Sequence, residues 1–179
     1  MKKLNFKLLF MLLAFLAQAC SSDDESFYYG PDYEIDDVQV TAPETESASS
    51  FAISLNLLSS NEYAYEYGFN PRVINGIADL NLSLISASAP TEIVGTDLNP
   101  YFLVDDALYF DAMYVTIADF VAKKELNSVK PILCFTNQTK LSLPYKALIS
   151  DTTILEIQVD VTLSDSKKFS EIVTTTIIP

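Results

Sequence analysis

Strict alternation of apolar and polar side chains marks the stretch Thr153-Ile154-Leu155-Glu156-Ile157-Gln158-Val159-Asp160-Val161-Thr162-Leu163. One face carries Leu155, Ile157, Val159, Val161 and Leu163, and the other carries Glu156, Gln158, Asp160 and Thr162. Because successive side chains of a β-strand point to opposite faces, the pattern predicts a strand with one buried face and one solvent-facing face.

The residues that follow extend this strand into a hairpin. Residues 164–168 have the polar composition of a turn, and residues 169–178 return as a segment rich in β-branched side chains. A hairpin with one wet face is the usual element of an antiparallel sandwich.

The same period of two recurs upstream, in shorter segments. Alternating or strand-like runs lie at 38–41, 51–57, 61–67, 77–85 and 131–135. The run at 61–67 places Tyr63, Tyr65 and Tyr67 on one face. These runs predict several short strands spread along the chain.

The middle of the chain is less regular. Residues 91–106 include Gly95 and Pro100, which favours a long loop or short edge pieces. Residues 107–117 fit both the helical and the strand period, and their aromatic and β-branched content favours a strand. Asp119 is then expected to open a short helix that ends near residue 126.

These patterns predict one mainly β domain over residues 34–179. We expect an immunoglobulin-like or related antiparallel two-sheet sandwich with one short helix near residues 119–126. The chain has 179 residues, of which 49% are hydrophobic, so it can bury a sizeable core.

The N-terminus has the layout of an export signal. Lys2, Lys3 and Lys7 precede an apolar run at 8–16, and small residues at 17–19 lead to Cys20. The apolar run is far shorter than the roughly 20 residues of a membrane span. The whole N-terminal segment up to Cys20 resembles the signal of bacterial lipoproteins. This resemblance implies cleavage after residue 19 and lipidation of Cys20. An ordinary secretory signal followed by a coincidental cysteine is the alternative.

An acidic segment follows the cysteine directly. Ser21-Ser22-Asp23-Asp24-Glu25 resembles the export signal of surface lipoproteins of the Bacteroidetes. The resemblance implies an outer-membrane, lipid-anchored protein facing the cell exterior, with Ser22, Asp23, Asp24 and Glu25 as the export signal. Residues 20–33 would then form a lipidated acidic tether. A solvated acidic linker without an export role is the alternative.

The charge of the processed chain restricts its partners. Residues 1–19 hold three of the 11 basic residues and none of the 24 acidic ones. The processed chain would therefore keep 8 basic and 24 acidic residues, a formal charge of −16. This excess argues against nucleic acid, because phosphates require Lys and Arg partners. Arg72 is the only arginine, and the chain contains no histidine. The composition therefore excludes histidine-dependent catalysis, and we expect no cofactor and no dedicated metal site.

Two kinds of carboxylate chemistry stay open. Asp105, Asp106 and Asp111 are the candidates for a glycosidase acid pair, although solvated acids of loops and strand faces are the favoured interpretation. Asp32, Glu34, Asp36 and Asp37 are closely spaced oxygen donors that would suit calcium, but they lack the order of an EF-hand loop. Cys134 has no disulfide partner once Cys20 is lipidated, and its apolar surroundings predict a buried, unreactive thiol.

Aromatic residues supply the candidate binding surface. The chain has ten tyrosines and no tryptophan. The candidate ligand-binding residues are Tyr63, Tyr65, Tyr67, Tyr101 and Phe102, which could contact a glycan or a surface protein; burial in the core is the alternative. We expect a non-catalytic binding or assembly module. A structural subunit of a fimbrial-type surface polymer and a carboxylate-dependent glycosidase are the alternatives.

Overall fold

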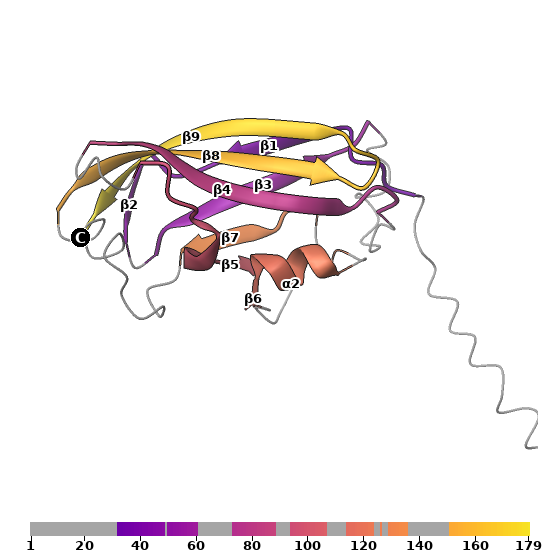
Figure 1. Ribbon diagram of the computed structural model, residues 1–179, viewed down its shortest axis with the longest axis horizontal. Coiled ribbons are helices and arrows are strands. Elements are labelled where there is room, and N and C mark those ends of the chain that lie inside the picture. The colour runs from indigo at the N-terminus through magenta and orange to yellow at the C-terminus, as the bar shows by residue number, and fades with distance from the viewer. Residues whose placement is uncertain are drawn as a thin grey trace, which may run out of the picture.

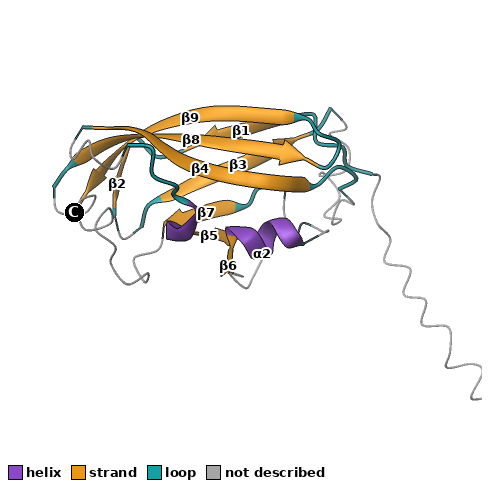
Figure 2. Cartoon of the chain, viewed as in Figure 1, coloured by secondary structure: helices purple, strands orange, loops and turns teal. Residues whose placement is uncertain are grey.

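The chain folds into two β-sheets that face each other. The computed structural model describes residues 32–48, 50–60, 73–88, 94–106, 114–123, 126, 129–135 and 151–179. The first sheet has the order β1 (Asp37–Thr41), β3 (Ala52–Leu58), β7 (Ile132–Phe135), β5 (Phe102–Asp105) and β6 (Tyr114–Thr116). The second has the order β2 (Thr45–Ser47), β9 (Lys168–Ile178), β8 (Thr153–Leu163) and β4 (Ile77–Ala87). Figures 1 and 2 show the two layers, with β9, β8 and β4 side by side.

The strands alternate between a face in the core and a face outside it. In β8 every second side chain from Thr153 to Leu163 is buried, and the residues between are half-buried or exposed. β3 repeats this pattern in the opposite sheet, with Ile53, Leu55 and Leu57 buried. The apolar faces of the two sheets therefore meet in one core, as sheet packing in a sandwich requires.

The fold class predicted from the sequence is confirmed. The chain is mainly β, with two sheets and one short α-helix among the residues that the structure describes. Neighbouring strands are antiparallel except β2 and β9, which pair in parallel. The predicted segments that fall in the described residues correspond to β1, β3, β4, β7, β8 and β9, within one or two residues at most ends. The predicted run at 61–67 lies outside the described residues.

The middle of the chain differs from the prediction. Residues 102–105 form β5, which lies between β7 and β6 inside a sheet rather than in a loop or at an edge. Residues 114–116 form β6, in agreement with the preference for a strand, whereas residues 107–113 lie outside the described residues. Ile117 already belongs to the helix.

That helix, α2 (Ile117–Ala122), begins two residues before Asp119. Thr116 caps it: the Thr116 hydroxyl accepts a hydrogen bond from the Asp119 amide at 3.1 Å and donates one to the Asp119 carboxylate at 2.7 Å. Such a side chain satisfies amide groups that have no partner in the first turn. Asp119 is thus the third residue of the helix rather than its cap.

A short 3-10 helix, η3 (Asn99–Tyr101), precedes β5 and lies against β4. The side chain of Asn99 accepts a hydrogen bond from the Leu82 amide at 2.8 Å and donates one to the Leu80 carbonyl at 3.1 Å. This segment therefore covers the outer edge of β4.

Candidate functional site

The structure describes some of the predicted site residues and not others. Tyr101, Phe102, Asp105, Asp106 and Cys134 lie in described segments. The candidate calcium ligands Asp32, Glu34, Asp36 and Asp37 are also described. The other candidates lie outside the described residues; they are Cys20, Ser22, Asp23, Asp24, Glu25, Tyr63, Tyr65, Tyr67 and Asp111.

Phe102 does not belong to a binding surface. Its side chain is 2% exposed, and its ring packs against Phe135 and Phe51 at centroid distances of 5.3 and 5.9 Å. Phe102 was a candidate ligand-binding residue with burial in the core as the alternative, and it is buried because Phe102 and Val104 form the inward face of β5. Tyr101 is half-buried and packs against the same core.

The candidate catalytic acids also differ in exposure. Asp106 follows β5 directly and is completely buried, so its carboxyl group is not accessible to a polysaccharide. Asp105 is half-buried on the outer face of the first sheet, opposite Ile132 of β7 and Tyr114 of β6. Only one of these two acids is therefore placed where it could contact a ligand.

Cys134 is half-buried, as a free thiol, in β7. Burial raises the pKa of this thiol, and the nearby Asp105 carboxylate raises it further. Since the thiolate is the reactive form, both effects make Cys134 a poor nucleophile at neutral pH.

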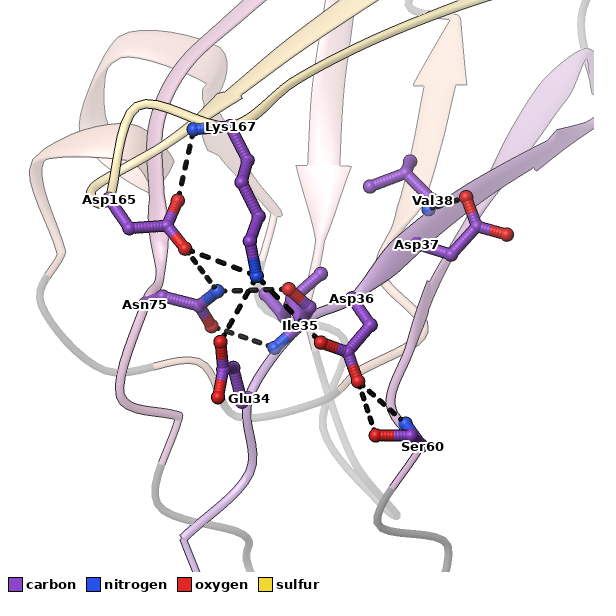
Figure 3. Close-up of polar contacts among 9 residues, drawn as sticks. All are labelled: Glu34, Ile35, Asp36, Asp37, Val38, Ser60, Asn75, Asp165 and Lys167. Atoms are coloured by element: carbon purple, nitrogen blue, oxygen red, sulfur yellow. Dashed lines mark hydrogen bonds and ion pairs between the residues drawn. The ribbon is translucent and has the colours of Figure 1, made fainter.

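A polar cluster at one end of the sandwich brings distant segments together. Lys167, in the turn between β8 and β9, directs its ammonium group at three carboxylates (Figure 3). Its Nζ lies 3.0 Å from Glu34 Oε1, 3.4 Å from Asp165 Oδ2 and 3.7 Å from Asp36 Oδ1. We call Glu34, Asp36, Asp165 and Lys167 the Lys167 cluster.

The buried side chain of Asn75 contacts the Lys167 cluster through hydrogen bonds. This side chain is 5% exposed; it accepts a hydrogen bond from the Ile35 amide at 2.7 Å and donates one to the Ile35 carbonyl at 2.9 Å. It also donates to Asp165 Oδ2 at 3.0 Å. One amide side chain therefore joins the backbone before β1 to the turn that carries Lys167 (Figure 3).

The residues before β1 are fixed to both sheets. The Tyr33 hydroxyl donates to the Leu57 carbonyl of β3 at 2.6 Å, and Asp36 accepts from the Ser60 amide and hydroxyl at 2.9 and 2.6 Å. Ile35 is completely buried, and Tyr33 is also part of the core. Tyr33, which the sequence analysis assigned to the tether, is therefore packed into the domain.

The β8–β9 turn is shaped to present Lys167. Ser166 has a φ of 72°, in the left-handed region, and its amide donates to the Leu163 carbonyl at 2.9 Å. Asp165 Oδ1 accepts from the Lys167 amide at 3.0 Å. Asp165 thus fixes the backbone of Lys167 while its other oxygen faces the ammonium group and Asn75.

The surroundings of Asp36, Asp165 and Lys167 shift their pKa values in the direction that favours the charged form. The pKa of Asp36 is lowered, mainly by the Ser60 hydroxyl, and that of Asp165 is lowered, mainly by Asn75. The pKa of Lys167 is raised, mainly by its hydrogen bond to Glu34. A glycosidase needs one carboxylic acid that is protonated at its working pH, which the lowered pKa values of Asp36 and Asp165 disfavour.

The same acids do not form a calcium site. Among the described residues, no group of three or more His, Cys, Asp or Glu side chains is arranged to hold a metal ion. Glu34 and Asp36, which were two of the candidate ligands, instead surround the Lys167 ammonium group. The cluster is an ion-pair network that holds chain segments together.

The cluster predicts a pH-dependent effect of Asp165→Asn on stability. Because the folded-state pKa of Asp165 lies below its ordinary value of 3.8, the carboxylate stabilises the folded state above that pH. The contribution is lost as pH falls through the lowered folded value. We expect the variant to melt a few degrees below wild type at pH 7, and the difference to close well below pH 3.8.

Asp79→Asn is the matched control, because Asp79 is an exposed carboxylate on β4 outside the cluster. Thermal melts of both variants and wild type between pH 2.5 and 7 would measure the differences. A constant difference between Asp165→Asn and wild type over this range would contradict the assigned role of the charge.

Comparison with known proteins identifies no relative of this chain. No known protein family, curated protein or solved structure matches this chain. Within the described part of the chain, no helix has the length and apolar character needed to span a membrane. Function must therefore be argued from the residues of this chain.

Proposed function

We propose that the chain is a non-catalytic lipoprotein, anchored in the outer membrane through Cys20 and facing the cell exterior, that binds a glycan or a surface protein. The signal-like residues 1–25 support the anchor and its address by resemblance. The observation that carries the proposal is the Lys167 cluster, which builds the segment directly after the acidic tether firmly into one end of the sandwich.

This arrangement suits a domain that is held by its N-terminal end. The start of β1 and the β8–β9 turn lie at one end of the sandwich, and the C-terminus lies at the other (Figure 1). Thirteen residue steps separate Cys20 from Tyr33, which span at most roughly 45 Å when extended. A lipid on Cys20 would therefore keep the cluster end of the domain close to the membrane surface.

The described residues offer no arrangement for the two alternatives. Asp106 is buried and therefore cannot reach a polysaccharide. The pKa values of Asp36 and Asp165 are lowered, which disfavours the protonated acid that a glycosidase needs. The C-terminal strand β9 lies between β8 and β2, and its Val173, Thr175 and Ile177 side chains are buried in its own domain. Donating this strand to a polymer would open the core.

The outer face of the first sheet is the binding surface that the structure favours. Tyr114, Asp105 and Ile132 lie in register across β6, β5 and β7, so their side chains share one face. Tyr114 is 56% exposed and Ile132 is 39% exposed. An aromatic ring and an apolar side chain around a carboxylate suit a sugar ring, which presents both C–H and hydroxyl groups.

A binding test with an activity readout separates the proposed module from an enzyme. The full chain would be applied to a glycan array, and the best glycan would be titrated with wild type, Tyr114→Ala and Ile154→Ala. We expect about tenfold weaker binding for Tyr114→Ala, which corresponds to about 1.4 kcal/mol. Ile154 is equally exposed on the opposite sheet and should have no effect.

The same preparations would be incubated with a panel of glycosides. The proposal expects no turnover. Hydrolysis of any glycoside that is abolished by Asp105→Asn or Asp106→Asn would contradict the proposal and favour the glycosidase. Unchanged binding by Tyr114→Ala would reject this surface as the ligand site.

A further inference from the structure

Among the described residues, strand β9 has an edge without a hydrogen-bonded partner strand over most of its length, although β1 of the facing sheet lies near it. Hydrogen bonds tie it to β8 along residues 168–177, but β2 covers only Thr176–Ile178 on the other side. There the Thr176 amide donates to the Glu44 carbonyl at 2.9 Å, and the Ala48 amide donates to the Ile178 carbonyl at 3.0 Å. Even-numbered residues of β9 therefore direct their backbone groups away from β8.

Between Lys168 and Thr174 no described segment pairs with these groups. The side chains of Lys168, Ser170, Ile172 and Thr174 are all exposed, and Ile172 is 58% exposed. In Figure 1, β9 lies next to β8, and β2 adjoins it only near the C-terminus. Among the described residues, the unpaired edge is thus seven residues long, and Ile172 is its one large apolar side chain that is exposed.

The opposite edge of the same sheet is sealed. The Gly95 amide donates to the Leu84 carbonyl at 2.6 Å, and the Leu98 amide donates to the Leu82 carbonyl at 2.8 Å. Together with the Asn99 side chain, these contacts cover β4 with a loop. Proteins commonly protect their sheet edges, because an open edge is a template for another strand.

We propose that the open edge of β9 pairs with the same edge of a second copy of this chain. The two strands would run antiparallel around a two-fold axis at Ile172, so that Ile172 faces Ile172 of the second copy and Ser170 faces Thr174. A two-fold contact requires a surface that complements itself, and the free backbone groups of residues 170, 172 and 174 are symmetric about Ile172.

The length of the edge fits this register. Pairing of residues 170–174 of both copies adds up to six backbone hydrogen bonds and places the two exposed isoleucines in direct contact. Thr176, where β2 begins, falls opposite Lys168, so β2 ends the new ladder on each side. The paired stretch therefore lies between the β8–β9 turn and β2 without displacing either.

The charge of Glu171 favours this register over the one shifted by one residue. A two-fold axis at Glu171 would place Glu171 directly opposite its own copy, which is unfavourable. With the axis at Ile172, Glu171 faces Val173, and the two exposed Glu171 side chains lie only diagonally across the axis. We therefore expect Glu171→Gln to strengthen the association several-fold.

Disulfide trapping tests the register directly. Directly opposed, hydrogen-bonded residues have Cα atoms about 5.5 Å apart, within the range that a disulfide spans. In the full chain carrying Cys20→Ala, Ile172→Cys should give a covalent dimer under mild oxidation. Ser170→Cys and Thr174→Cys should each stay monomeric, and the chain with both substitutions should dimerise.

The parent chain, which retains Cys134, provides the baseline for this experiment. Equal trapping of all three single variants, or none by Ile172→Cys, would overturn the proposed pairing. Analytical ultracentrifugation of the parent should show a concentration-dependent dimer that Ile172→Pro weakens at least tenfold, because proline removes an edge amide that no described residue uses.

The fold of each variant would be checked by circular dichroism. If Ile172→Pro unfolds, Ile172→Lys would be used in its place. A lysine at position 172 would lie directly opposite the lysine of the second copy, and this like-charge contact should also abolish the dimer. A parent that stays monomeric at millimolar concentration would refute the proposal.

Discussion

Replacing Val159 with aspartate is expected to unfold the sandwich. Val159 is 1% exposed and lies in the middle of β8, between Leu82 of β4 and Glu171 of β9. A buried carboxylate without a partner costs several kcal/mol, which is comparable to the 5 to 15 kcal/mol of a typical domain. The adjacent residue provides the matched control, because Gln158 points to the outer face.

Gln158→Asp should leave the chain folded at a modest cost. Gln158 donates hydrogen bonds to both carboxylate oxygens of Asp160, at 2.8 and 3.0 Å. The variant loses this contact and places two like charges near each other on a partly solvated face. We expect a loss of about 1 kcal/mol in the free energy of unfolding.

Circular dichroism melts of the two variants and wild type would measure both effects. The prediction requires loss of the folding transition for Val159→Asp and a shift of a few degrees for Gln158→Asp. Similar losses for the two variants would mean that both faces of β8 are buried, in conflict with the observed alternation.

The long strands could be predicted because their alternation is unbroken. In β8, eleven residues follow the period of two, so the bounds of the strand coincide with those of the pattern. β2 and β5 have three and four residues, too few for a period to be distinguished from chance. The helix start was misplaced because Thr116, a usual capping residue, was not considered.

The contacts of the Lys167 cluster could not be predicted from local patterns. Lys167 and Glu34 are 133 residues apart in the sequence, and Asn75 and Asp165 are 90 apart. The sequence did single out Glu34 and Asp36 as closely spaced oxygen donors that would suit calcium, but in the structure they lie beside the Lys167 ammonium group. The sequence left open whether Phe102 is buried, because the neighbouring strands decide which side chains of a four-residue strand point inward.

The second large effect concerns the anchor. We expect removal of Cys20, the proposed site of acylation, to release the domain from membranes, because acyl chains contribute about 0.8 kcal/mol per buried CH2 and several chains bind durably. The described residues contain no spanning helix that could replace the lipid. The acidic composition, with a formal charge of −13 for the whole sequence, also opposes adsorption to anionic lipid.

The most direct test is the distribution of the chain between washed membranes and the soluble fraction. Cys20→Ala would be produced behind an ordinary cleavable secretory signal in place of residues 1–19, so that no uncleaved apolar segment holds it. The wild-type chain is predicted in the membrane pellet, and the variant, folded and with an unchanged melting transition, almost entirely in the soluble fraction. Retention of the variant in washed outer membranes would contradict the proposal that this protein is a lipid-anchored surface module.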